Sequence, residues 1–271
     1  MKLWNKEDNL DKKIEEFTVG NDRKYDMYLA KYDVIASIAH AKMLCKINIL
    51  TDEESTKIIN TLNNIFKNIE SENFNIGNGF EDIHSKIESL LIDELGNIGK
   101  KIHTGRSRND QVLVATQLFL KNEINEIKKL TIKLFNTLID LAETNKNELL
   151  PGYTHLQVAM PSSFGLWFSS YAENLIDDIL YLKTAYEINN QNPLGSGAGY
   201  GSSFKIDRNF TTKELDFGDL KYNVVSAQMS RGKVEKSVII AINSIASTLS
   251  RLSSDICFYM TQELNFVSFP D

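Results

Sequence analysis

The stretch of this chain with the most reactive side chains runs from residue 101 to residue 114 and reads KIHTGRSRNDQVLV. Five side chains that can carry positive charge fall between residues 100 and 108: Lys100, Lys101, His103, Arg106 and Arg108. An apolar helical pattern follows directly. Because the first turn of a helix has unpaired backbone N–H groups and a positive dipole end, the pattern predicts an anion site. The alternative is a plain helix start, capped by Ser107 or Asn109, with solvated arginines.

A second candidate is His155, in the segment GYTHLQ between Pro151 and Pro161. Proline interrupts helices, so this segment is expected to be the loop between two long helices. A histidine beside Thr154 and Gln157 can act as a general acid or base near neutral pH. The alternative is that His155 only caps the next helix.

Two further segments could serve a site. His84 follows Glu81 and Asp82, so it is either a piece of a site or a first-turn residue behind acids that favour a helix N-terminus. Four glycines fall between residues 195 and 201, but they lack the spacing of a dinucleotide motif and the Gly-Lys-Ser/Thr end of a P-loop. We expect a flexible or closely approaching loop there.

Composition narrows the classes of function. A net charge of −6 argues against nucleic acid as a main partner. The four histidines show no metal-ligand spacing, and no G-x-S-x-G motif occurs, so we expect no metal and no serine hydrolase. Cys45 and Cys257 are expected to be reduced core residues. Without a signal-peptide core or a run of about eighteen apolar residues, a cytoplasmic protein away from membranes is expected.

Helical periodicity covers most of the chain. Apolar residues recur at helical spacing over 27–49, 51–69, 81–95, 107–149, 162–188 and 224–264. Thr51 and Glu54 have the spacing of a capping box at the start of the second segment. Residues 96–105 are expected to be a loop.

These lengths predict two domains. Residues 1–105 would form a small N-terminal helical domain, and residues 106–271 the long helices. The helix over 107–149 would be roughly 60 Å long, at about 1.5 Å per residue. Such a helix cannot bury its apolar stripe alone, so we expect an all-α fold whose long helices form a bundle completed by other subunits.

The motifs occur together, and in this order, in one family, and the chain resembles the argininosuccinate lyases of the fumarase/aspartase superfamily. The matching segments are Tyr32-Asp33, Ser37–His40, Glu81–His84, His103–Gln111, Gly152–Gln157, Pro193–Gly199 and Ile206–Arg208. H-T-G-R-S-R-N-D-Q together with G-Y-T-H-L-Q favours this family over fumarase, aspartase and adenylosuccinate lyase.

The resemblance implies an enzyme that reversibly cleaves argininosuccinate to L-arginine and fumarate without a cofactor, as the last step of arginine biosynthesis. It implies His155 as the catalytic acid/base. It also implies a substrate site built from Ser37, Asn109 and Thr154, with Ser107 and Arg108 near the carboxylates and Gln157 and His84 in support. The implied assembly is a homotetramer whose sites combine segments of different subunits.

The family pattern continues beyond residue 271, into a Gly-Ser-Ser-x-Met-Pro-x-Lys loop that carries the proton-abstracting serine, then further bundle helices and a C-terminal domain. We therefore expect the 271 residues alone, truncated before that domain, to be inactive. Two alternatives stay open: a non-enzymatic, delta-crystallin-like scaffold, and a superfamily lyase with another amino leaving group. The intact polar motifs argue against the first, and substrate preference would decide the second.

Overall fold

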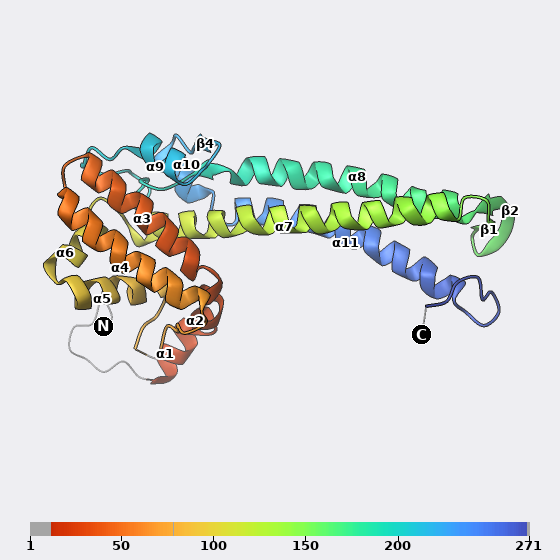
Figure 1. The fold of residues 1–271 in the computed structure, drawn as a ribbon, viewed down its shortest axis with the longest axis horizontal. Helices are drawn as coiled ribbons and strands as arrows, with labels where there is room; N and C mark the ends of the chain where they lie inside the picture. The colour runs from red at the N-terminus through yellow and green to blue at the C-terminus, as the bar shows by residue number, and fades with distance from the viewer. Residues whose placement is uncertain (1–11, 78, 270–271) are drawn as a thin grey trace. The chain divides into compact units, whose positions relative to one another are not determined.

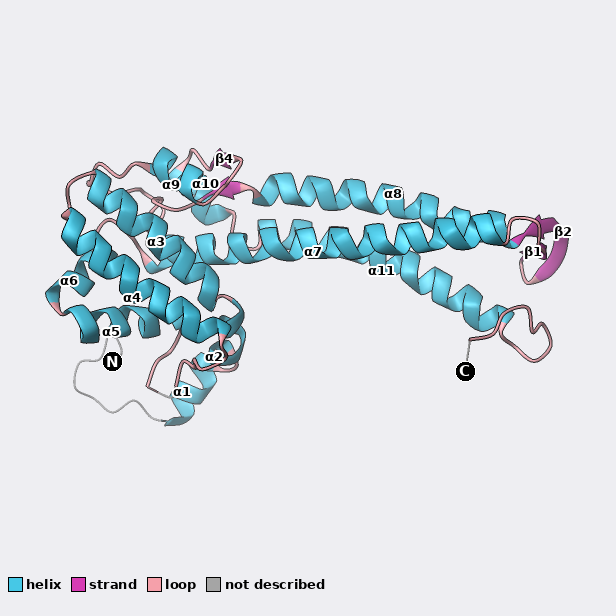
Figure 2. Ribbon diagram, viewed as in Figure 1, coloured by secondary structure: helices cyan, strands magenta, loops and turns pink. Residues whose placement is uncertain are grey.

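The computed structural model describes residues 12–77 and 79–269, most of which are helical (Figures 1 and 2). The α-helices are α1 (Lys12–Val19), α2 (Asp22–Tyr25), α3 (Ala30–Lys46), α4 (Asp52–Glu70), α5 (Ile83–Leu95), α6 (Asn97–Lys100), α7 (Arg108–Thr144), α8 (Phe164–Asn189), α9 (Arg208–Glu214), α10 (Val224–Met229) and α11 (Lys233–Tyr259). Two 3₁₀ helices, η1 (Asp26–Tyr28) and η2 (Lys101–His103), accompany them. The prediction of a helical fold is confirmed.

Two small sheets interrupt the helices. β1 (Leu149–Thr154) pairs antiparallel with β2 (Gln157–Ser163). β3 (Gln191–Asn192) pairs parallel with β4 (Asp219–Leu220). The apolar periodicity of the sequence predicted neither sheet.

Contacts divide the chain into two compact units. Unit 1 comprises the described residues up to Lys121 together with Asn189–Lys233, and unit 2 comprises Asn122–Ile188 and the described residues from Val234 onward. The long helix α7 contributes residues to both units. This division does not coincide with the domains 1–105 and 106–271, which were defined by helix length and stay a prediction.

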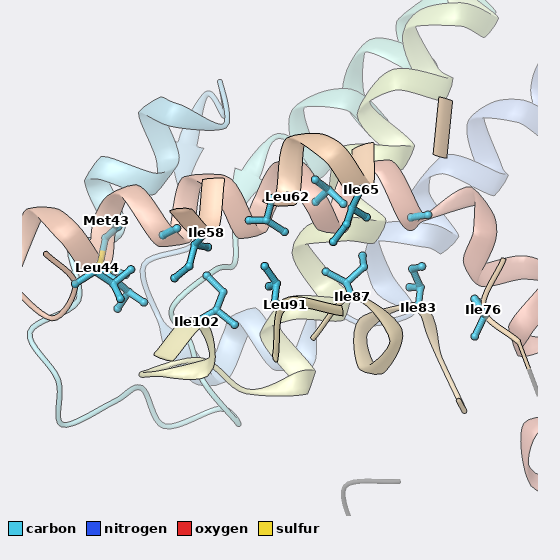
Figure 3. Packing of buried hydrophobic residues seen from close by; sticks show 14 residues of the cluster. Met43, Leu44, Ile58, Leu62, Ile65, Ile76, Ile83, Ile87, Leu91 and Ile102 are labelled. Atoms are coloured by element: carbon cyan, nitrogen blue, oxygen red, sulfur yellow. The ribbon is translucent and has the colours of Figure 1, made fainter. Parts of the chain in front are cut away.

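The core of unit 1 lies between α3, α4 and α5. Ile58 and Leu62 of α4 point toward Ile87 and Leu91 of α5, and all four are at most 2% exposed (Figure 3). Burying one leucine or isoleucine side chain contributes about 1.5–3 kcal/mol. This packing therefore holds α5 firmly, and with it the first turn that carries His84.

The predicted capping box at the start of α4 is confirmed. Thr51 Oγ1 accepts a hydrogen bond from the backbone N–H of Glu54 at 3.2 Å, and Glu54 Oε2 accepts one from the backbone N–H of Thr51 at 3.1 Å. Two N–H groups that the helix cannot satisfy thus find partners.

We expect Thr51→Ala to lower the free energy of unfolding by about 1 kcal/mol, because the cap is lost. Urea denaturation measures this change. Thr56→Ala is the matched control, since Thr56 lies exposed inside the same helix and its hydroxyl donates only to the Asp52 carbonyl. Equal losses in the two variants would contradict a capping role for Thr51.

The predicted uninterrupted loop over 96–105 is wrong, because α6 and η2 occupy most of it. Gly99 permits this path: a Cβ at that position would lie only 2.3 Å from the carbonyl oxygen of Leu91. The backbone can therefore pack directly on the C-terminal part of α5. A helix of four residues is too short to show periodicity in a sequence.

The predicted continuous helix over 224–264 is also wrong. It is divided into α10 and α11 by a turn at Ser230–Gly232, and α11 ends at Tyr259. Gly232 has a φ of +78°, a left-handed conformation that glycine adopts readily and that no helix continues through. Apolar residues on both sides of the turn keep similar spacing, which hides the break.

In unit 2, the C-terminal part of α7 packs with α8 and α11 around Leu138, Leu175 and Leu252. Polar contacts join α8 to α11 beside this core. Trp167 Nε1 and the Tyr171 hydroxyl donate to Asp255 Oδ2 at 3.0 Å and 2.6 Å. Because both donors reach one carboxylate, they fix how α8 and α11 lie along each other.

Both cysteines are free, Cys45 half-buried and Cys257 exposed. The prediction of a core position is therefore wrong for Cys257. The apolar residues of α11 extend around more of the helix than unit 2 covers, since Ile239 and Ile240 are 65% and 52% exposed. None of the helices in the described part of the chain combines the length and the apolar character needed to cross a bilayer.

Candidate active site

The site predicted at residues 101–111 is built around the start of α7. Asp110 Oδ1 accepts a hydrogen bond from the backbone N–H of Ser107 at 2.8 Å, and Ser107 Oγ accepts one from the backbone N–H of Asn109 at 3.3 Å. The helix start is thus capped by Ser107, as the alternative reading expected. Asn109 is exposed, while Ser107 and Arg108 are half-buried, so capping leaves polar side chains at the surface.

Three of the five cations face carboxylates of unit 1. The ion pairs join Lys101 to Glu54 at 2.5 Å and Arg108 to Asp82 at 3.4 Å and to Glu88 at 3.7 Å, while His103 Nδ1 lies 3.5 Å from Glu88 Oε2. Arg108 also donates to Ser85 Oγ at 3.3 Å. An anion bound at the start of α7 would therefore compete with α5 for the guanidinium of Arg108.

The fourth cation, Arg106, is buried. Its side chain is 8% exposed, and Nη1 donates to Ser37 Oγ at 2.9 Å. Its position in the sequence predicted a cation at residue 106 but no role for it in the site. Because no local pattern distinguishes it from Arg108, only the fold reveals that Arg106 is buried while Arg108 is half-buried.

Arg106 meets a polar stripe on α3 formed by Asp33, Ser37 and His40, all at most 1% exposed. Spacings of four and three residues place these side chains on one face of the helix. His40 Nε2 donates to the backbone carbonyl of Thr104 at 3.0 Å. Burial, and then the charge of Arg106, lower the pKa of His40 to about 3, so His40 is neutral at physiological pH.

Asp33 connects this stripe to His84 and to α7. Its Oδ1 accepts from Gln111 Nε2 at 2.8 Å and lies 3.0 Å from His84 Nδ1. Burial raises the pKa of Asp33 above its usual value, although the charge of Arg106 and the hydrogen bond from Gln111 partly oppose this rise. His84 is 2% exposed, so it supports the site from beneath the surface.

The first turn of α5 is tied to the preceding chain by Asp26. Its Oδ2 accepts from the backbone N–H of Ile83 at 3.1 Å, next to His84. Burial raises the pKa of Asp26 from 3.8 to about 6, and the backbone hydrogen bond opposes this only in part. Asp26 therefore titrates near physiological pH.

We expect this titration to appear in the stability of the protein. Because the folded-state pKa of Asp26 lies above the unfolded value, the native state binds the proton more tightly. This contribution to the free energy of unfolding is present below pH 3.8 and is lost as the pH rises through about 6. Urea denaturation across that range should show a less negative pH slope for Asp26→Asn than for the unmutated protein. Identical slopes in the two proteins would contradict a raised pKa of Asp26.

The glycine-rich segment 193–201 approaches α7 closely, as expected. Asp110 Oδ2 accepts from the backbone N–H groups of Gly195 and Gly197, at 2.9 Å and 3.0 Å. The two residues are 85 and 87 positions away along the chain. Asp110 is thus a second residue of this site whose role depends on contacts distant in the sequence.

The segment around His155 is a β-hairpin and not a loop. Thr154 pairs with Gln157, and His155 and Leu156 form the two-residue turn with φ angles of +53° and +59°. Turns of this kind favour asparagine and glycine, because other residues are strained at positive φ. Such strain is typical of functional sites. His155 lies before β2 rather than at the start of α8, so the helix-capping alternative is wrong.

The predicted site residues fall into two sets. Unit 1 contains Ser37, His84, Ser107, Arg108 and Asn109, and unit 2 contains Thr154, His155 and Gln157. In the first set, Ser37 accepts from Arg106, His84 lies beside Asp33, and Arg108 pairs with Asp82. The second set lies exposed on the hairpin. Among the residues that the structure describes, no three His, Cys, Asp or Glu side chains gather as metal ligands would.

Comparison with known proteins identifies the family of the chain. A family model described as Lyase matches residues 5–271. The argininosuccinate lyase of Bacteroides fragilis is 52% identical over 270 residues, which are 100% of this chain and 60% of that protein. The argininosuccinate lyase of Thermotoga neapolitana is 43% identical, over 99% of this chain and 68% of that protein. The chain thus spans about 60% of the length of the first of these relatives.

Solved structures show the same fold at lower identity. EDDS lyase in complex with formate matches with a TM-score of 0.81 and 24% identity, over 92% of this chain and 50% of that one. A fumarate lyase:delta crystallin from Brucella melitensis matches with a TM-score of 0.75 and 19% identity, over 88% of this chain and 57% of that one. From the family model and the sequence relatives, the chain belongs to the argininosuccinate lyase family of the fumarase/aspartase superfamily.

Proposed function

We propose that the protein containing this chain catalyses the reversible cleavage of argininosuccinate to L-arginine and fumarate. The observation that carries the proposal is the start of α7, where the exposed Asn109 and the half-buried Ser107 and Arg108 lie together in a chain 52% identical to an argininosuccinate lyase. A purely structural scaffold does not require these polar side chains at its surface.

The reaction sets clear demands on a site. A proton leaves the carbon beside a carboxylate, its electron pair forms the double bond of fumarate, and the bond from the next carbon to the guanidinium nitrogen breaks. That nitrogen departs with a proton. The carboxylate collects negative charge as the proton leaves, so donors must already surround it. A base must take the first proton and an acid must supply the second.

The start of α7 suits the carboxylates. The exposed amide of Asn109 and the hydroxyl of Ser107 can donate to them, and the helix dipole favours their charge. Arg108 adds a cation after exchanging its contacts with α5. Ser37 is buried beneath Arg106, so in our proposal it contributes by holding that guanidinium under the site.

His155 suits the proton transfers. It is exposed at the tip of the hairpin, with Thr154 and Gln157 on the paired strands beside it. In our proposal His155 is the acid/base, Thr154 donates to the substrate, and Gln157 supports them. The buried His84 supports the first turn of α5 together with Asp33.

We further propose that the enzyme is a cytoplasmic homotetramer. Unit 2 leaves several large apolar side chains at its surface: Leu130 at 66%, Ile176 at 50%, Leu180 at 57% and Ile239 at 65% exposed. Long helices with such faces are stabilised when other helices cover them. Light scattering that finds a monomer over the working range of concentrations would contradict the tetramer.

The test of function uses the product of the complete gene. We expect purified protein to release fumarate from argininosuccinate, seen as ultraviolet absorbance, together with an equal amount of arginine. Absence of fumarate from the complete, folded protein would refute the proposal, and turnover of a different amino-succinate adduct would point to another lyase of the superfamily.

A further inference from the structure

One buried carboxylate, Asp110, accepts three backbone hydrogen bonds. It is 0% exposed, and its partners are the N–H groups of Ser107, Gly195 and Gly197, at 2.8, 2.9 and 3.0 Å. The two carboxylate oxygens of Asp110 have different partners. Oδ1 completes the cap of α7, while Oδ2 holds the glycine loop, residues 193–201.

The glycine loop has the shape that this contact needs. Gly195 and Gly197 have φ angles of +85° and +61°, which let both N–H groups point at one oxygen. Side chains would not fit there. A Cβ at Gly197 would lie 2.6 Å from the carbonyl oxygen of Gly201, and one at Gly195 would lie 2.8 Å from Arg208 Cγ.

The far side of the loop is held as well. Gln228 Nε2 donates to Ser196 Oγ and to the Gly197 carbonyl oxygen, both at 3.0 Å. Arg208 Nε donates to the Leu194 carbonyl oxygen at 2.9 Å. The loop is therefore clamped between α9 and α10 on one side and a single carboxylate on the other.

We propose that Asp110 is a positioning residue that locks the first turn of α7 against the glycine loop and thereby sets the places of Ser107 and Asn109 for the substrate. This inference rests on the proposed function, in which those two residues hold the carboxylates. Asp110 itself is buried and does not touch substrate. Its contribution is to binding, because it fixes groups that meet the substrate before and during the reaction alike.

The decisive variant is Asp110→Asn in the complete protein. An amide keeps the size of the side chain but replaces one accepting oxygen by a donor, which must then face Ser107 N–H or the two glycine N–H groups. We expect KM for argininosuccinate to rise about tenfold with kcat changed less than about threefold. In hydrogen exchange, the amides of Gly195 and Gly197 should lose protection by about tenfold or more.

Thr51→Ala is the matched control, because it removes a helix cap of the same unit whose hydrogen bonds involve neither Asp110 nor the glycine loop. It should lower stability while leaving KM and the exchange of the glycine amides unchanged. If Asp110→Asn does not fold, Gln228→Ala is tested in its place, because loss of Gln228 loosens the glycine loop from the α10 side. Gln228→Ala should then raise KM and speed the hydrogen exchange of the glycine amides. Unchanged KM and unchanged protection in the folded variant would overturn the inference. A complete, unmutated protein without turnover would instead refute the proposed function, and the exchange result would still test the lock.

Discussion

Replacing His155 by asparagine is expected to lower kcat for argininosuccinate cleavage by about 10²–10⁴-fold, the usual contribution of a general acid or base. Asparagine suits this test because it tolerates the left-handed conformation that His155 adopts at φ +53°. The hairpin should therefore keep its turn while the imidazole is lost. Steady-state assays of fumarate release from the complete protein measure the effect.

Leu156 offers a matched control within the same turn. It is exposed, has a φ of +59°, and carries no group that could transfer a proton. Leu156→Asn changes the turn to the same degree as His155→Asn but should leave kcat within about threefold of the unmutated value. Equal losses in both variants would mean that the turn, and not the imidazole, limits the rate.

The turn at His155 could not be predicted from the sequence, whereas the long helices could. The long helices α7 and α8 were predictable because their apolar residues recur over many turns, and the cap at Thr51 because its two partners are three residues apart. The hairpin carries none of the asparagine–glycine pairs that mark such turns. Its strain is maintained by the paired strands and was invisible in the residue types.

In the candidate site, the contacts that could not be predicted join residues far apart in the sequence. The motif at residues 103–111 located Ser107, Arg108 and Asn109 at a helix start, and the resemblance to a known family suggested their partners. Neither the motif nor the resemblance could show that Arg106 turns inward to Ser37, 69 positions away. They also could not show that Asp110 reaches Gly195, 85 positions away. Such contacts depend on how helices pack, which local patterns do not specify.

Because Arg106 is buried, replacing it is expected to lower the stability of the protein. We expect Arg106→Met to lower the free energy of unfolding by about 1–3 kcal/mol, because the buried Ser37 hydroxyl loses its hydrogen-bond donor and Asp33 loses a nearby positive charge. Asp33 is 0% exposed, and burial alone raises its pKa; Arg106 is the largest influence that lowers it. Without that charge, the carboxylate of Asp33 must be buried unpaired or take up a proton. Urea denaturation near pH 7 measures the loss.

A double-mutant cycle separates this charge effect from lost packing. Ser37→Ala removes only the neutral partner of Arg106 and should cost about 1 kcal/mol, while leaving the charge in place. Asp33→Asn removes the charge that Arg106 balances, so combining it with Arg106→Met should cost about 1–3 kcal/mol less than the sum of the single changes. Strict additivity would show that the two charges do not depend on each other. Arg106 would then act through its hydrogen bond to Ser37 and its packing, and not through the charge of Asp33.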